Sequence, residues 1–330
     1  MRAFGFRSTG GPEVLEEIDQ PAPSAGDGQV LIRVAYAGVN FAEIQHRRGE
    51  FGEPDGANGY DVPGLEVAGT VAETGAGVAG VTIGERVAAY LPGFGGYAEL
   101  AVADAGFVRP VGGLSLVDAA GVACVYVTAY GILTDAGRMR PGDTVLVHAA
   151  AGGVGSAAAR LARLLGADRV YGTVGSAAKL PLATPLGYDA VFLRDDFGTG
   201  IRAATGGRGV DLVLDPIGGP VRQASLAALA PFGRLVAYGD LGRHQDWTAD
   251  LRSLWKNNQS VAGYNIGDVA RRAPAMIGDH LARALSALGA GELRPEPPTV
   301  VPLADVADAH RRLEAGTTQG KTVLMIGPGH

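Results

Sequence analysis

The stretch Val147-His148-Ala149-Ala150-Ala151-Gly152-Gly153-Val154-Gly155 decides the fold of this 330-residue chain. It begins at the end of an apolar segment, 144–148, passes through small residues, and enters a predicted helix over 154–165. Small residues leave the backbone open, so its N–H groups and the positive end of the helix dipole can meet a pyrophosphate. The usual dinucleotide fingerprint is Gly-x-Gly-x-x-Gly, and here the early positions are alanines. The turn alone therefore leaves two interpretations open, a structural strand–helix turn and a dinucleotide-binding turn.

The chain around this turn alternates between strand and helix signals. Residues 144–148 form a continuous apolar run, which is typical of a parallel sheet covered on both faces. Further strands are predicted at 169–174, 190–192, 211–214, 234–238 and 260–264. Such alternation predicts a doubly wound α/β sheet of the Rossmann type, which favours the dinucleotide interpretation of the turn.

Both ends of the chain have a different pattern. Short β-segments at 29–36, 66–72 and 85–90, separated by glycine and proline, predict a small, mostly antiparallel β domain. Ser115 is placed to cap a short helix that follows this domain. Near the C-terminus, helices are predicted at 275–288 and 303–313, and a last strand at 321–326 is expected to return to the first domain.

The end of the second strand of the alternating region indicates the cofactor. An NAD site places an acid about 20 residues after the turn, where it holds the ribose 2′-hydroxyl. No acid lies between Val170 and Lys179, and Asp168 precedes the strand. Ser176 and Lys179 suit a 2′-phosphate instead, and Arg194 offers a second positive charge. We therefore expect NADPH, and the alternative is that both cations lie on a solvated helix face.

Composition excludes several classes of protein. Hydrophobic residues make up 47% of the chain and charged residues 19%, which predicts a globular protein with a sizeable core. A net charge of −6 gives no indication of the basic surface that nucleic acid or an anionic membrane requires. Cys124 is the only cysteine, so it is expected to be buried and inert. No segment has the pattern of a signal peptide or membrane span, and we expect a cytoplasmic protein with a small-molecule substrate.

Over nearly its whole length the chain resembles the quinone oxidoreductases, the zeta-crystallin-like branch of the medium-chain dehydrogenase/reductase superfamily. Besides the turn, the stretches that carry the resemblance are 35–41, 63–69, 127–130, 175–179 and 320–324. The resemblance implies a Rossmann domain inserted into a mostly antiparallel, GroES-like catalytic domain. The expected boundaries are 1–122, 123–262 and 263–330, and relatives usually form homodimers through the cofactor-domain sheet.

The resemblance also implies roles for individual residues. Asn40 and Thr128 would lie near the nicotinamide and its ribose, and Tyr238-Gly239 would follow the fifth strand beside the nicotinamide. The complete expected cofactor set is Asn40, Thr128, Gly152, Gly153, Val154, Gly175, Ser176, Lys179, Arg194, Tyr238 and Gly239.

The zinc-dependent alcohol dehydrogenases of the same superfamily bind catalytic zinc through a cysteine, a Gly-His-Glu motif and a later ligand. Here Gly64-Leu65-Glu66 has leucine in place of the histidine, and no cysteine precedes Cys124. One carboxylate does not make a zinc site, so no metal is expected.

The residues at the positions of the family's proton donor differ from the family pattern. Relatives often carry tyrosines where this chain has Gln45 and Phe51. We expect Asn40 and Gln45 to serve catalysis, and the substrate to lie against Gln45, Phe51, Tyr264 and Asn265. His46 is expected on a solvated helix face because arginines follow it.

The leading hypothesis is NADPH-dependent, zinc-independent reduction of quinones by hydride transfer. A hydroquinone anion takes its proton from water, whereas an alkene needs a proton on carbon. The first alternative is a reductase of activated alkenes (an enone, an enoyl thioester or a biosynthetic intermediate), with Tyr60, Tyr264 and His46 as candidate donors. The second alternative is an NADPH-binding protein with little turnover.

Overall fold

The structure is a computed structural model, and it describes residues 1–54, 59–244 and 248–327. The chain divides into two compact units. Both ends of the chain form the first, which we call the terminal unit: Met1–Val127, Ala270–Gly291 and Glu296–His330. The second, the central unit, comprises Thr128–Val269 with Glu292–Pro295.

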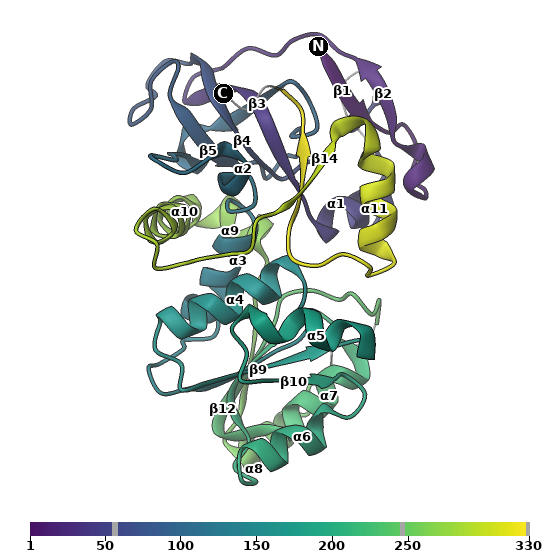
Figure 1. Ribbon diagram of the computed structural model, residues 1–330, viewed down its shortest axis with the longest axis vertical. Coiled ribbons are helices and arrows are strands. Elements are labelled where there is room, and N and C mark those ends of the chain that lie inside the picture. Colours follow the sequence, from purple (N-terminus) through teal and green to yellow (C-terminus); the bar gives the residue numbers. More distant parts are fainter. Residues whose placement is uncertain (55–58, 245–247, 328–330) are drawn as a thin grey trace. The chain divides into compact units, whose positions relative to one another are not determined.

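The central unit is built on a six-stranded, all-parallel sheet (Figure 1). Its strands are β8 (Thr144–Val147), β9 (Arg169–Val174), β10 (Ala190–Leu193), β11 (Val210–Asp215), β12 (Leu229–Ala237) and β13 (Ser260–Gly263). Their order across the sheet is β10-β9-β8-β11-β12-β13, so the direction of winding reverses between β8 and β11. This is the doubly wound order of a dinucleotide-binding sheet, in which ligands bind at the carboxyl ends of the strands at the reversal.

Helices alternate with the strands of the central unit, and the predicted helix at 154–165 is α4. They are α3 (Val125–Tyr130, which begins in the terminal unit), α4 (Gly153–Leu164), α5 (Leu180–Ala183), α6 (Phe197–Ala204), α7 (Gly219–Ala227) and α8 (Leu251–Asn257). Gly166 follows the C-terminal end of α4. Its φ is 89°, a left-handed conformation that glycine adopts at low cost. Leu146, Val213 and Leu235 pack with Phe197 and Ile201 into a core cluster of this unit.

The terminal unit contains a seven-stranded, mostly antiparallel sheet with the path β14-β15-β3-β4-β5-β7, with β6 paired to β3, and a separate β1-β2 hairpin. The strands are β1 (Arg2–Gly5), β2 (Glu16–Asp19), β3 (Gln29–Val39), β4 (Glu66–Thr74), β5 (Arg86–Tyr90), β6 (Leu100–Asp104), β7 (Val108–Pro110), β14 (Thr299–Pro302) and β15 (Thr322–Met325). The last strand does return to the first domain, because Thr322 lies opposite Val39 in an antiparallel pair. The predicted fold class is therefore confirmed.

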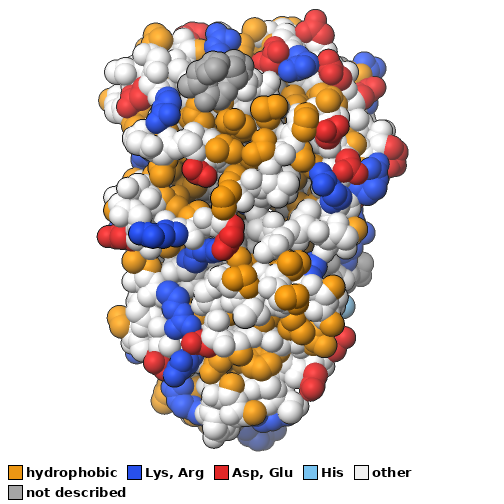
Figure 2. Space-filling model, viewed as in Figure 1, with side chains coloured by type: hydrophobic (Ala, Val, Ile, Leu, Met, Phe, Trp, Pro, Cys, Tyr) orange, Lys and Arg blue, Asp and Glu red, His pale blue; other side chains and the backbone are white. Residues whose placement is uncertain are grey.

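The remaining helices are α1 (Phe41–Arg47), α2 (Leu116–Ala119), α9 (Ile266–Arg272), α10 (Pro274–Gly289) and α11 (Val306–Glu314). Ser115 caps α2 as expected, because its Oγ accepts the Asp118 N–H at 3.2 Å. Cys124 is buried. On the face that Figure 2 shows, acidic and basic side chains are interspersed. Within the described residues, the structure contains no helix with the length and apolar character of a membrane span.

Candidate active site

The predicted dinucleotide turn joins β8 to α4 in the central unit. Ala149 has a φ of 55°, and Ala150 donates its N–H to the carbonyl oxygen of Thr173 on β9 at 2.9 Å. A side chain at Gly155 would collide with the Ala149 carbonyl oxygen, so glycine there lets the helix pass close to the strand. Gly152 is the N-cap of α4 and has no side chain to occupy its N–H groups. The turn therefore leaves a twelve-residue helix open to an anion at its positive end.

Buried hydrogen bonds fix the conformation of this turn. The Tyr188 hydroxyl donates to the carbonyl oxygens of Ala150 and Gly155 at 3.2 and 2.8 Å. His148 lies 2.7 Å from the hydroxyls of both Thr173 and Ser225. Ser225 donates its proton to the Val221 carbonyl, so it accepts from Nε2 of His148, and Nδ1 accepts from Thr173. Burial lowers the pKa of His148 to about 4, which keeps the ring neutral.

The residues predicted for a 2′-phosphate gather after β9. Arg194 lies over Gly175, where any side chain would collide with its guanidinium. Partial burial, and then the charge of Arg194, lower the pKa of Lys179. Ser176 is exposed directly after Gly175. Two cations held near one another beside an open hydroxyl fit a bound phosphate, because an anion between them relieves their repulsion.

A network that sequence reasoning missed lies at the reversal point. Asp215 ends β11, is fully buried, and accepts the N–H groups of Ile217 and Gly218 at 2.7 and 3.2 Å. Arg222 donates to Asp215 at 2.7 Å and to the carbonyl of Gly239 at 3.0 Å. An acid at the end of a predicted strand, followed by two glycines, was the available signal.

The network ties the loop after β11 to the loop after β12, which carries the predicted Tyr238-Gly239 pair. Burial, and then the nearby Asp215 carboxylate, raise the pKa of Tyr238, so its phenol stays protonated.

The other predicted residues of the central unit differ in exposure. Thr128 is buried in α3. Tyr264 is 9% exposed, and its ring occupies the space that a side chain at Gly131 would need. Asn265 is exposed, and its Oδ1 accepts the Asp268 N–H at 3.1 Å.

In the terminal unit, Asn40 is the N-cap of α1 and belongs to a tight polar cluster. Glu43 is fully buried and accepts the Asn40 backbone N–H at 2.7 Å, its amide at 3.1 Å and the Leu65 N–H at 2.9 Å. Burial raises the pKa of Glu43 to about 7, and the Lys321 charge acts in the opposite direction. Lys321 donates to Asn40 Oδ1 at 2.6 Å and lies 2.6 Å from Glu66.

The zinc motif of the superfamily is therefore replaced by an ion pair. Glu66 contacts Lys321 with one oxygen and accepts the Cys124 N–H with the other at 2.7 Å. Leu65, at the histidine position, contributes only its backbone N–H to Glu43. Across the described residues, no group of three or more His, Cys, Asp or Glu side chains is arranged to hold a metal ion.

The expectation that His46 lies on a solvated face is wrong. Its side chain is 13% exposed, its Nε2 lies 2.8 Å from Asp61, and its ring stacks on Phe94 at 4.0 Å between centroids. The arginine that follows it, Arg47, is fully buried and donates to Glu314 at 2.5 Å. The reason is tertiary: α1 is covered on this side by α11 and by the loop that carries Phe94.

Gln45 and Phe51 contact residues that do not belong to the Asn40 cluster. Gln45 is half-buried and donates to Glu50 at 2.9 Å. Phe51 is 58% exposed, with its ring centroid 6.5 Å from that of Phe94. The Tyr60 hydroxyl donates to Glu16 at 2.9 Å.

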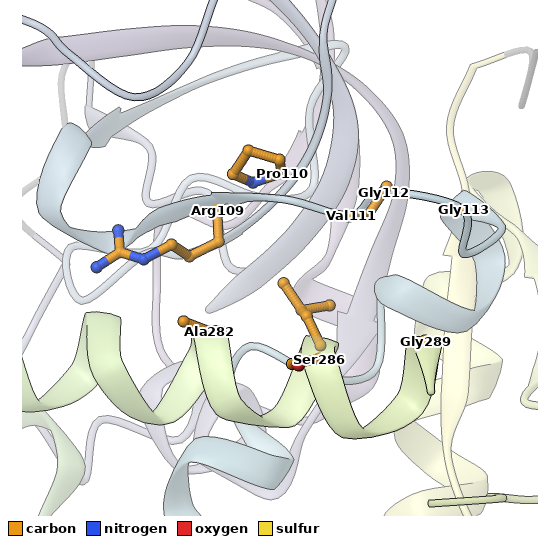
Figure 3. A pocket seen from close by; sticks show the side chains of 9 residues that line it. Arg109, Pro110, Val111, Gly112, Gly113, Ala282, Ser286 and Gly289 are labelled. Atoms are coloured by element: carbon orange, nitrogen blue, oxygen red, sulfur yellow. The ribbon is translucent and has the colours of Figure 1, made fainter. Parts of the chain in front are cut away.

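A cavity of about 350 Å³ in the terminal unit lies between β7 and α10 (Figure 3). Its lining is Arg109, Pro110, Val111, Gly112, Gly113, Ala282, Leu285, Ser286 and Gly289. Arg109 donates to the carbonyls of Gly106 and Val108 at 3.0 and 2.7 Å. None of the predicted site residues lines this cavity, so it is not the predicted site.

A parallel dinucleotide-type sheet together with a GroES-like β unit defines the class of the medium-chain dehydrogenases/reductases. Residues 26–113 match the alcohol dehydrogenase GroES-like domain, and residues 153–281 match the zinc-binding dehydrogenase family. The chain belongs to the quinone oxidoreductase branch of this superfamily.

Individual relatives agree with this assignment. A mycobacterial protein solved in complex with NADPH is 32% identical, with a TM-score of 0.88 over 98% of this chain and 99% of that one. A mycobacterial quinone oxidoreductase is 33% identical, with a TM-score of 0.85 over the same shares of the two chains. A phenolphthiocerol/phthiocerol polyketide synthase of Mycobacterium tuberculosis is 36% identical over 96% of this chain. The chain spans only 8–14% of the length of such synthases.

Proposed function

We propose that this protein is an NADPH-dependent, zinc-independent reductase that transfers hydride to quinones. The observation that carries the cofactor assignment is a pair of cations, Lys179 after β9 and Arg194 after β10, near the end of β9 where an NAD site has an acid. The similarity to a mycobacterial protein in complex with NADPH supports it. The similarity to a mycobacterial quinone oxidoreductase supports the acceptor.

The residues of the central unit suit cofactor binding. In this proposal Gly152, Gly153 and Val154 receive the pyrophosphate at the start of α4. Gly175, Ser176, Lys179 and Arg194 receive the 2′-phosphate, and Thr128, Tyr238 and Gly239 lie toward the nicotinamide. The bound cofactor supplies the hydride.

Residues of the terminal unit, together with two of the central unit, would position the nicotinamide and the acceptor. Asn40 orients the nicotinamide or its ribose, and Gln45 donates a hydrogen bond to the quinone oxygen as charge develops there. Phe51, Tyr264 and Asn265 lie against the ring of the acceptor. The hydroquinone anion takes its proton from water, so no side-chain acid is required. Holding the two rings together supplies most of the catalysis.

A second candidate function is reduction of an activated alkene. It is favoured by the polyketide synthases that this chain matches, two of which are named as reducing synthases. Among its candidate donors, Tyr60 is bonded to Glu16, His46 to Asp61, and Tyr264 is buried. A protein that binds NADPH with little turnover is the third possibility.

The homodimer is also a proposal. The strand β13 is an edge of the parallel sheet. Val261 on this strand is 39% exposed, and Leu251 and Trp255 on the preceding helix α8 are 77% and 75% exposed. An unpaired edge with large apolar side chains favours pairing with a second copy. Light scattering should give a dimer for the wild type and a monomer for Val261→Lys, and a monomeric wild type would refute the proposal.

An acceptor panel tests the reaction. NADPH oxidation is measured with para- and ortho-quinones, with enones and with enoyl thioesters, at equal enzyme concentration. The proposal predicts turnover with quinones and little with the alkenes. Turnover with an alkene and none with quinones would assign the second function. Tight NADPH binding without turnover on any acceptor would assign the third.

A further inference from the structure

The amide of Asn40 is held between two partners of opposite charge. Lys321 Nζ donates to Asn40 Oδ1 at 2.6 Å, and Asn40 Nδ2 donates to Glu43 Oε1 at 3.1 Å. An ammonium has only donors, so the atom that faces it is the amide oxygen. The two oxygens of Glu43 accept the backbone N–H groups of Asn40 and Leu65, so they act as acceptors and the atom that faces them is the amide nitrogen. Both contacts therefore require the same orientation, and turning the amide over would place like polarities against each other.

Lys321 is itself immobilised. Its ammonium meets Asn40 Oδ1 at 2.6 Å, the Val39 carbonyl oxygen at 2.9 Å and Glu66 Oε1 at 2.6 Å. The first two contacts are hydrogen bonds and the third is an ion pair, so three oxygen atoms surround the ammonium. The stem of the side chain passes over Gly121, where a Cβ would lie 2.8 Å from Lys321 Cγ.

The cluster joins parts of the chain that are far apart in sequence. Lys321 precedes β15, Asn40 follows β3, and the antiparallel pair of Thr322 with Val39 sets the two residues opposite each other. Glu66 is fully buried at the start of β4. Asn40 is only partly buried, so the rest of its amide can be reached by a ligand.

We propose that Lys321 is a positioning residue for hydride transfer. Lys321 and Glu43 together fix the orientation of the Asn40 amide, so that one N–H and one carbonyl lone pair of Asn40 face the ligand. This inference rests on the proposed function, in which Asn40 orients the nicotinamide or its ribose. Lys321 acts through Asn40 and touches neither cofactor nor acceptor. Glu66 balances the charge of Lys321, which explains why a carboxylate remains in a chain whose zinc motif has lost its histidine.

A mutant cycle tests the coupling. Lys321→Met is combined with Glu66→Gln, so that the carboxylate that Lys321 contacts is neutralised together with it. This charge-balanced variant and Asn40→Ala are compared, separately and together, by single-turnover oxidation of NADPH and by the affinity for NADPH. We expect the charge-balanced variant to slow hydride transfer about tenfold, the scale of one well-placed hydrogen bond. In the Asn40→Ala background it should cause no further loss. Losses that multiply, or an unchanged rate in the charge-balanced variant, would overturn the inference.

A second measurement does not depend on turnover. The side-chain amide signals of Asn40 are assigned in ¹⁵N NMR spectra by their loss in Asn40→Ala. They should move or broaden in Lys321→Arg, which keeps the charge but replaces the compact ammonium by a planar fork. Unmoved Asn40 signals in Lys321→Arg and in the charge-balanced variant would show that Lys321 does not position the amide. A wild type that holds these signals fixed but neither binds NADPH nor reduces an acceptor would refute the proposed function and leave the positioning intact.

Discussion

Arg194 lies directly over Gly175, so that its guanidinium fills the space that a side chain at position 175 would occupy. Arg194 also acts on Lys179, whose pKa is lowered by partial burial and then by this neighbouring charge. The two cations and the glycine together form the part of the central unit that distinguishes NADPH from NADH in our proposal.

Lys179→Ala should weaken NADPH binding by about ten- to a hundredfold, because a charge-assisted contact to phosphate contributes roughly 1.5–3 kcal/mol. NADH binding should be nearly unchanged. Fluorescence titration with both cofactors measures the two affinities, and Lys256→Ala, at an exposed position on α8, is the matched control. Equal losses for both cofactors would mean that Lys179 only supports the fold.

Gly153→Asp should abolish cofactor binding and leave a folded protein. A carboxylate at the start of α4 would repel the pyrophosphate, and its bulk would obstruct close approach of the backbone. Circular dichroism checks the fold, and NADPH titration checks binding. Gly113→Asp introduces the same charge at an exposed position with no heavy atom within 4 Å of a Cβ, and it should bind normally. Normal titration of Gly153→Asp would show that the turn is only structural.

Metal removal should have no effect on turnover. Leu65 replaces the zinc histidine, and Glu66 is paired with Lys321 at 2.6 Å. Purified protein should contain much less than one equivalent of zinc, as measured by elemental analysis, and chelators should not slow it. A tightly held equivalent whose removal stops turnover would contradict this prediction.

The contribution of His148 to stability should fall on acidification between about pH 6.5 and 4, the ordinary and the folded pKa of this residue. In this window the unfolded chain binds a proton that the folded chain does not, so stability is fully present above the window and is lost as the pH falls. One such histidine contributes a slope of at most about 1.4 kcal/mol per pH unit. Burial lowers the pKa of His310 to about 3, so it acts in the same direction, whereas the raised pKa of Glu43 acts in the opposite direction between about pH 7 and 4.5.

Urea unfolding of the wild type and of His148→Asn across this range measures the effect. The variant should be less stable overall but less dependent on pH. An equal slope in both proteins would show that His148 is not buried in its neutral form.

Gln45→Ala should lower turnover with quinones by about tenfold, the scale of one neutral hydrogen bond in the transition state. Gln45 donates one N–H to Glu50 at 2.9 Å, and its amide carries a second N–H. Glu50→Ala separates the two roles, because it removes the partner and keeps Gln45. An equal loss in both variants would mean that Gln45 acts only through Glu50.

The fold could be predicted from sequence because each element carries its own local signal. The apolar run at 144–148, the glycines of the turn and Gly166 after α4 act within a few residues of one another. The Asn40 cluster carries no such signal, because Lys321 is 281 residues from Asn40 in sequence. The burial of Arg47 was missed for the same reason, since its partner Glu314 lies 267 residues away. Charged residues in succession indicate a solvated helix face until a distant element supplies partners.

Oxidation of NADPH by the wild-type protein, with a para-quinone as the only acceptor and followed from pH 6 to 8, distinguishes a quinone reductase from an alkene reductase. We expect one hydroquinone formed for each NADPH oxidised, at a rate that is nearly independent of pH, because the hydroquinone anion takes its proton from water and no side chain donates one. A quinone that is not reduced, while an enone or enoyl thioester turns over with a bell-shaped pH profile, would contradict this expectation.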